Sequence, residues 1–252
     1  MSGTGKLAGK VALVTGGSRG IGGAIVRAFA AEDADVAFCH LADHDKALAM
    51  AAEVEALGRR VHHDEADVAD PDTCASFAAA AKAALGPIDI LVNNAGIGIS
   101  RAFEDVTVDD FERIMNVHVR GTFFMTQAVY GDMVARGRGR IINISSQLAY
   151  NGMADLTPYC AAKGAIGAFT RALAHEATPK GILVNAIAPG PVITSLFPDD
   201  DEAGDANFKA RLPIGRFAEP HEIAPTAVLL ASDGGNYYVG ATLSPNGGDV
   251  MF

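Results

Sequence analysis

Short apolar runs alternate with helical patterns along almost the whole chain of 252 residues, without long linkers. Strands are expected near residues 10–15, 35–40, 60–64, 88–92, 139–145, 182–188 and 240–244, and most of these stretches are apolar. The helical patterns lie near residues 20–32, 44–58, 71–85, 109–136, 157–179 and 219–232. Apolar strands separated by helices are typical of a parallel sheet with helices on both faces. We therefore predict an α/β, doubly wound fold in which residues 1–252 form a single domain.

The first apolar run leads directly into the glycine-rich turn Gly16-Gly17-Ser18-Arg19-Gly20-Ile21-Gly22 and then into a helical pattern. A strand, a glycine turn and a helix N-terminus together form a phosphate-binding site, because free backbone N–H groups point at the anion. The spacing Gly-x-x-x-Gly-x-Gly differs from the common dinucleotide motif, and no Gly-Lys-Ser/Thr follows as in a P-loop. Taken alone, the segment also fits a plain glycine-rich turn.

A tyrosine, a lysine and a serine in the second half of the chain have a spacing that suits proton transfer. Tyr159 and Lys163 stand four residues apart, so they share one face of a helix, and Ser146 precedes the tyrosine. A neighbouring ammonium favours the phenolate and is expected to lower the pKa of Tyr159 from its free value of about 10. Tyr159 then exchanges a proton with a carbonyl or alcohol oxygen. Ser145 is the rival hydroxyl, and we favour Ser146 because adjacent strand residues point to opposite faces.

Further motifs stand at the ends of other predicted strands and on one helix. They are Asp67-Val68, Asn93-Asn94-Ala95-Gly96, Asn116 within Met-Asn-Val-His-Val, and Pro189-Gly190-Pro191-Val192-Ile193-Thr194. With the glycine turn and the Ser146, Tyr159 and Lys163 set, these motifs follow the order found in the short-chain dehydrogenase/reductase family. The chain resembles that family over nearly its whole length.

The resemblance implies a Rossmann-type fold and an NAD(P)-dependent oxidoreductase that interconverts a ketone and a secondary alcohol by hydride transfer. It implies that Ser146 polarises the substrate oxygen, Tyr159 exchanges the proton, Lys163 stabilises the phenolate and holds the ribose, and Asn116 anchors a water. Cofactor binding is expected of Gly16, Ser18, Arg19, Gly20, Ile21, Gly22, His40, Asp67, Val68, Asn94, Ala95, Gly96, Tyr159, Lys163, Pro189, Gly190, Val192 and Thr194. His118 is interpreted as a packing or interface residue. The alternative is a catalytically silent NAD(P)-binding sensor or scaffold, which the complete catalytic set disfavours.

Two positions bear on the choice of cofactor. His40 ends the second strand, where an acidic residue would bind the ribose hydroxyls of NAD, and Asp43 comes three residues later. Arg19 in the glycine turn suits the 2′-phosphate of NADP. We therefore favour NADP, with NAD as the alternative if a shifted loop brings Asp43 to the ribose.

The irregular stretch at about 190–218 follows the predicted nicotinamide loop, and we interpret it as a lid over the substrate. The expected pocket wall is Gln147, Leu148, Tyr150, Asn151, Met153, Leu156, Val192, Leu196 and Phe197. This wall carries no cationic clamp for a carboxylate or phosphate. A neutral carbonyl, a sugar or polyol, and a 3-oxoacyl thioester all remain open as substrates.

Charge and composition exclude several other classes of protein. The formal net charge of −10 argues against nucleic acids and anionic membranes as partners. No apolar run approaches the roughly 18 residues of a membrane span. Scattered Cys39, Cys74 and Cys160 and a start without an apolar signal core favour a cytoplasmic protein. No metal site is expected, because His62–Glu65 ends a strand and the acidic run 199–202 suits a solvated loop.

Two helical patterns, near 109–136 and 157–179, carry apolar residues over more than one stripe. Such helices need a partner besides their own sheet. Tyr237, Tyr238 and the end Val250-Met251-Phe252 offer a second contact. Two different two-fold contacts generate a closed homotetramer, which is the assembly we expect. Full burial of both helices within one subunit is the alternative.

Overall fold

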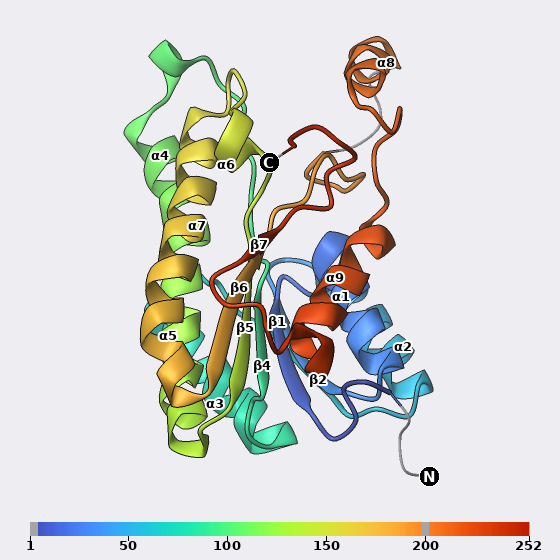
Figure 1. Cartoon of the computed structure of the whole chain (residues 1–252), viewed down its shortest axis with the longest axis vertical. Coiled ribbons are helices and arrows are strands. Elements are labelled where there is room, and N and C mark those ends of the chain that lie inside the picture. Colours follow the sequence, from blue (N-terminus) through green and yellow to red (C-terminus); the bar gives the residue numbers. More distant parts are fainter. Residues whose placement is uncertain (1–4, 198–201, 252) are drawn as a thin grey trace.

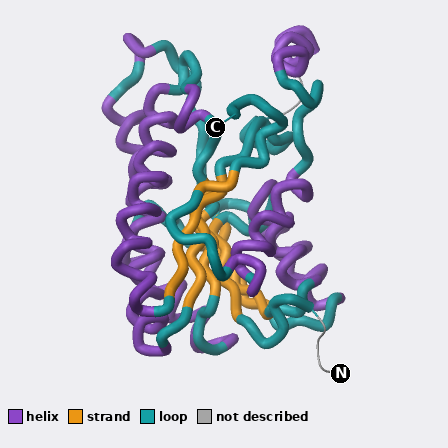
Figure 2. Tube along the Cα trace, in the orientation of Figure 1, coloured by secondary structure: helices purple, strands orange, loops and turns teal. Residues whose placement is uncertain are grey.

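A twisted parallel sheet forms the centre of the molecule (Figures 1 and 2). The computed structural model describes residues 5–197 and 202–251. Within them, seven strands pair in the order β3-β2-β1-β4-β5-β6-β7. The strands are β1 Val11–Thr15, β2 Asp35–His40, β3 Val61–Glu65, β4 Ile90–Asn93, β5 Gly139–Ile144, β6 Ile182–Ile187 and β7 Thr242–Leu243. All neighbours are parallel, as the alternation of strands and helices predicts.

Helices cover both faces of the sheet (Figure 1). One layer contains α1 Gly20–Ala31, α2 His44–Ala56 and α9 Pro220–Ala231. The other contains α3 Pro71–Leu85, α4 Val108–Met115, α5 Gly121–Arg136 and α7 Thr157–Ala177. Shorter elements are α6 Leu148–Asn151, α8 Glu202–Arg211, a π turn at Asn116–Arg120, and 3-10 turns at Phe103–Asp105, Thr178–Lys180 and Asp233–Gly235. The predicted α/β, doubly wound, Rossmann-type arrangement is confirmed.

Each layer of helices closes its own apolar core, because successive strand residues point to opposite faces of the sheet. Ala12 and Val14 of β1 pack with Phe29 of α1 in one core, whereas Leu13 packs with Phe77 of α3 in the other. All five residues of β1 are buried. A strand buried on both faces has to be apolar throughout, which explains the continuous apolar runs of the sequence.

The direction in which successive strands are added reverses between β1 and β4. From β1 the chain continues through β2 and β3 on one side, and from β4 it continues through β5, β6 and β7 on the other. Ligands of doubly wound folds bind at such a switch point, outside the carboxyl ends of the strands. Thr15 and Asn94 tie the two strand ends together. The Thr15 hydroxyl accepts hydrogen bonds from the Asn94 and Ala95 amides at 2.9 and 3.0 Å, and the Asn94 side chain donates to the Thr15 carbonyl at 2.9 Å. The fold therefore holds the two halves of the crevice in a fixed relation.

Three details differ from the sequence-based expectation. The helix expected over 109–136 is α4 and α5 with the π turn between them. The stretch expected to be irregular at 190–218 contains α8. The strand expected at 240–244 is reduced to two residues that pair with β6. Residues 199–201 of the acidic run and Phe252 of the chain end lie outside the described residues.

Candidate active site

A cavity of about 680 Å³ opens at the carboxyl ends of the strands and is lined by residues of every predicted motif. The predicted cofactor residues along it are Gly16, Ser18, Arg19, Gly20, Ile21, His40, Asp67, Val68, Asn94, Ala95, Gly96, Tyr159, Lys163, Pro189, Gly190, Val192 and Thr194. Gly22 lies behind the turn, where its position for a Cβ is 2.2 Å from the Gly16 carbonyl oxygen. Its role is close packing of α1 rather than contact with a ligand.

The glycine turn keeps the space above α1 open. Gly20 has a φ of +56°, a left-handed conformation that disfavours any side chain. A Cβ there would lie 3.5 Å from Thr194, in the gap between the turn and the 189–194 loop. Backbone N–H groups at the start of α1 face the same crevice, which suits the pyrophosphate of a dinucleotide. The residues present therefore fit a nicotinamide dinucleotide, which would supply a hydride at this site.

Three polar side chains meet beside the glycine turn. Asp43 accepts a hydrogen bond from the Ser18 hydroxyl at 3.2 Å and forms an ion pair with Arg19. Burial raises the pKa of Asp43, but the hydrogen bonds from Arg19 and Ser18 and the charges of Arg19 and Lys46 outweigh it and hold the pKa below its usual value. Arg19 also donates to the hydroxyl of Ser195, beyond the 189–194 loop. Arg19 thus links the glycine turn, the loop after β2 and the start of the predicted lid.

The end of β5 and the first turns of α7 bring the predicted Ser146, Tyr159 and Lys163 together at the cavity. The Nζ atom of Lys163 donates to the Ile144 carbonyl at 2.8 Å and lies 5.5 Å from the centre of the Tyr159 ring. The Ser145 hydroxyl instead donates to the backbone carbonyl of Lys163 at 2.9 Å. Ser145 therefore anchors α7 to β5, and Ser146 is the hydroxyl left to face Tyr159.

Burial dominates the protonation of the tyrosine and the lysine. The protein around the Tyr159 phenol raises its pKa to about 12, although a hydrogen bond with Ser146 opposes that rise. Burial lowers the pKa of Lys163 to about 7. The expectation that the ammonium lowers the tyrosine pKa is therefore wrong for this site, because desolvation penalises both charged forms. A neutral Tyr159 is a proton donor, as carbonyl reduction requires.

The structure does not bring Asn116 to the cavity. Asn116 is half-buried at the start of the π turn and is absent from the described residues that line the site. His118, two residues later, is 1 % exposed and lines the cavity. Its ring meets the Tyr159 ring edge-on, with 5.3 Å between the ring centres. Sequence reasoning interpreted His118 as a packing or interface residue, so this neighbour of Tyr159 was missed.

The substrate side of the cavity is more apolar than the sequence indicated. Of the expected wall, the lining residues are Gln147, Leu148, Met153, Leu156, Val192, Leu196 and Phe197, whereas Tyr150 and Asn151 lie elsewhere. Phe208 of α8 joins this wall and was not predicted. It packs edge-on against Phe197 and Phe217, with ring centres 6.1 and 5.4 Å apart. A helix of the 190–218 stretch therefore contributes directly to the cavity.

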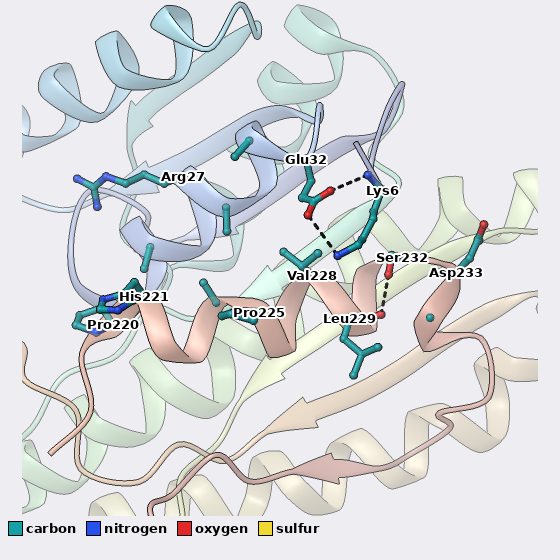
Figure 3. Close-up of a pocket in the computed structure, with 15 residues that line it drawn as sticks. Lys6, Arg27, Glu32, Pro220, His221, Pro225, Val228, Leu229, Ser232 and Asp233 are labelled. Atoms are coloured by element: carbon teal, nitrogen blue, oxygen red, sulfur yellow. Dashed lines mark hydrogen bonds and ion pairs between the residues drawn. The ribbon is translucent and has the colours of Figure 1, made fainter. Parts of the chain in front are cut away.

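A second cavity of about 990 Å³ lies between α1 and α9 and contains none of the predicted site residues (Figure 3). Its wall is mostly aliphatic, with Lys6 and Glu32 paired at one end.

In the part of the chain that the structure describes, no cluster of histidine, cysteine and acidic side chains suits a metal ion. None of the helices in that same part combines the length and apolar character of a membrane span.

Comparisons with known proteins agree with the geometry of the first cavity. The family model described as short chain dehydrogenase matches residues 10–204. An acetoacetyl-CoA reductase of Shinella zoogloeoides is 41 % identical over 96 % of this chain and 99 % of its own length. A glucose and ribitol dehydrogenase of Daucus carota is 40 % identical over 98 % of this chain and 87 % of its own.

Solved structures are similar over nearly the whole chain. A blue fluorescent protein from a metagenomic library, in complex with NADPH, has a TM-score of 0.93 and 43 % identity. That match covers 98 % of this chain and all of the other. A short chain dehydrogenase of Burkholderia cenocepacia J2315 with NADP has a TM-score of 0.90 and 38 % identity, covering 96 % of this chain and 98 % of the other. Fold, motifs and relatives thus agree: the chain belongs to the short-chain dehydrogenase/reductase family and is an NAD(P)-dependent oxidoreductase acting on CH–OH or C=O groups.

Proposed function

We propose that this protein interconverts a ketone and a secondary alcohol with NADP(H), and that its substrate carbonyl is flanked by apolar groups. The observation that carries the proposal is the meeting of Ser146, Tyr159 and Lys163 at one cavity. The Ser146 hydroxyl binds and polarises the carbonyl oxygen, which develops negative charge as hydride reaches the carbon. Tyr159 donates its proton to that oxygen, and Lys163 supports the resulting phenolate.

The apolar wall favours a 3-oxoacyl thioester or another apolar ketone over a sugar. Leu148, Met153, Leu156, Leu196, Phe197 and Phe208 line the substrate side, with Gln147 as a polar neighbour. A sugar needs many precisely placed hydrogen-bonding groups, because each hydroxyl buried without a partner costs binding energy. A thioester leaves its long carrier outside the cavity and inserts a short acyl chain. The named relatives include both acetoacetyl-CoA reductases and sugar dehydrogenases.

A substrate screen tests this function. The purified protein is assayed by nicotinamide absorbance with NADPH and NADH against acyclic ketones, acetoacetyl-CoA, sugars and polyols. Turnover of apolar ketones or acetoacetyl-CoA supports the proposal, and turnover of sugars alone contradicts the apolar-substrate part. Cofactor binding without turnover of any compound would favour the silent sensor or scaffold.

The preference for NADP(H) rests on Arg19. In the structure its guanidinium pairs with Asp43 at the edge of the cavity. The 2′-phosphate of NADP would replace the Asp43 carboxylate as the partner of Arg19 and carries more negative charge. NAD has a hydroxyl at that position and offers Arg19 no charge. The two similar structures with NADPH and NADP support this choice. Asp43→Asn, which frees Arg19, is expected to tighten NADPH binding more than NADH binding in a fluorescence titration. An unchanged ratio of the two affinities would contradict the assignment.

Assembly into a homotetramer and a cytoplasmic location are part of the same proposal. Ile114, Val129, Ile166 and Ala177 of the two expected interface helices are buried within the subunit. Phe123 of α5 remains 45 % exposed and contacts Phe169 of α7, with ring centres 5.4 Å apart. Tyr237 and Tyr238, before β7, and Met251, near the end of the chain, are also exposed. Apolar side chains exposed at these separate positions suit contacts with further copies of the chain, as two different two-fold contacts of a tetramer require.

A further inference from the structure

The environment of His118 is unusual for a packing residue. Its Nε2 atom lies 2.8 Å from the Ile97 carbonyl oxygen and 3.1 Å from the Ile97 amide nitrogen. Its Nδ1 atom is buried without a protein partner among the described residues. An imidazole that lines the cavity and bonds the backbone of its wall is placed to do more than fill space.

The ring lies between two parts of the active site. On one side it contacts the Ile97 backbone, in a segment whose residues Asn94 to Gly98 line the cavity. On the other side it meets the Tyr159 ring edge-on. Gly96 makes room for it, because a Cβ at Gly96 would lie 2.6 Å from Cε1 of His118. His118 thereby sets the separation between Tyr159 and the segment beside the cofactor.

The imidazole performs this task as a neutral group. Burial, together with the nearby Lys163 charge, lowers the pKa of His118 to about 3. A neutral ring donates from one nitrogen and accepts at the other, so Nε2 bonds either the Ile97 amide or the Ile97 carbonyl, but not both at once. An asparagine amide offers both a donor and an acceptor. Asparagine at position 118 is therefore the conservative replacement.

We propose that His118, rather than Asn116, is the helix residue that positions Tyr159 against the cofactor segment 94–98. The proposal rests on the proposed function only for its kinetic test. His118→Phe keeps the ring and its contact with Tyr159 but removes both nitrogens. His118→Asn restores the bonds to Ile97. Asn116→Ala removes the residue that the sequence pattern favoured.

Steady-state kinetics with the most active ketone and NADPH form the first measurement. His118→Phe is expected to lower kcat by about tenfold or more with little change in KM, since small misplacement of a proton donor is costly. His118→Asn should recover kcat to within about threefold of the wild-type value, and Asn116→Ala should stay within about twofold. A loss for Asn116→Ala that equals the loss for His118→Phe would overturn the proposal, as would native kcat in His118→Phe.

Hydrogen exchange of the Ile97 amide, measured without substrate, is the second readout. His118→Phe should speed this exchange by about tenfold or more, and His118→Asn should restore its protection. Unchanged exchange in His118→Phe contradicts the positioning contact. If no compound is turned over, the proposed function fails while this measurement still decides the role of His118. If His118→Phe does not fold, His118→Ala replaces it in the exchange experiment, and a kinetic loss in Asn116→Ala still overturns the assignment.

Discussion

The buried Lys163 predicts how the stability of this protein depends on pH. Its side chain is 4 % exposed, and burial lowers its pKa from 10.5 to about 7. Between those two pH values the folded protein keeps the lysine neutral, whereas the unfolded chain keeps it protonated. Because the unfolded state then binds more protons, the free energy of unfolding rises with pH. For this one group the rise between about pH 7 and 9 is about 2 kcal/mol.

Other buried groups act in different pH ranges. Burial raises the pKa of Cys39 from 9.0 to about 12, that of Cys74 from 9.0 to about 11 and that of Tyr159 from 10.0 to about 12. The unfolded chain ionises these groups first, so they reduce stability as the pH rises above about 8. Burial lowers the pKa of His118 from 6.5 to about 3, so His118 changes the free energy of unfolding mainly at pH values below about 6.5. The cysteines and the tyrosine act alike in the wild type and in Lys163→Met, so the difference between these two proteins isolates Lys163.

The test compares urea unfolding of the wild type, Lys163→Met and Lys180→Met at about pH 7, 8 and 9. Circular dichroism follows unfolding at one protein concentration, without added cofactor. Lys180 is an exposed lysine and serves as the matched control. The wild type and Lys180→Met should gain about 2 kcal/mol more than Lys163→Met over this range. Equal gains in all three proteins would refute the buried, neutral Lys163.

Three further predictions concern chemistry, cofactor and assembly. Tyr159→Phe keeps the ring but removes the proton donor, so turnover should fall by about 10²-fold or more while the Kd for NADPH changes little; near-native turnover would exclude Tyr159 as the acid. Arg19→Ala should weaken NADPH binding by about 1–3 kcal/mol more than NADH binding, and equal losses in titrations would contradict its phosphate role. Light scattering at micromolar concentration should give four times the mass of one chain; the mass of a single chain would exclude the tetramer, and twice that mass would leave one interface.

The sequence alone determined the layers of the fold and most of the active site. Strands buried on both faces must be apolar throughout, so the central strands of a doubly wound sheet stand out in the sequence, whereas the edge strand β3 is mostly polar. Glycine turns at strand ends depend on local backbone conformation, which neighbouring residues specify. Tyr159 and Lys163 were found because both lie on one uninterrupted helix, where a separation of four residues guarantees a shared face.

Only the tertiary structure decided which residue of the neighbouring helix reaches Tyr159. Residues two apart on a helix point in nearly opposite directions, so only one of Asn116 and His118 can face the cavity. The π turn at Asn116–Arg120 changes the helical phase between α4 and α5, and packing against α7 sets which side faces inward. The ion pair of Arg19 with Asp43 and the contact of Phe208 with the cavity also join segments far apart in the chain. Local sequence patterns carry no information on such contacts, because the folding of the whole chain brings those side chains together.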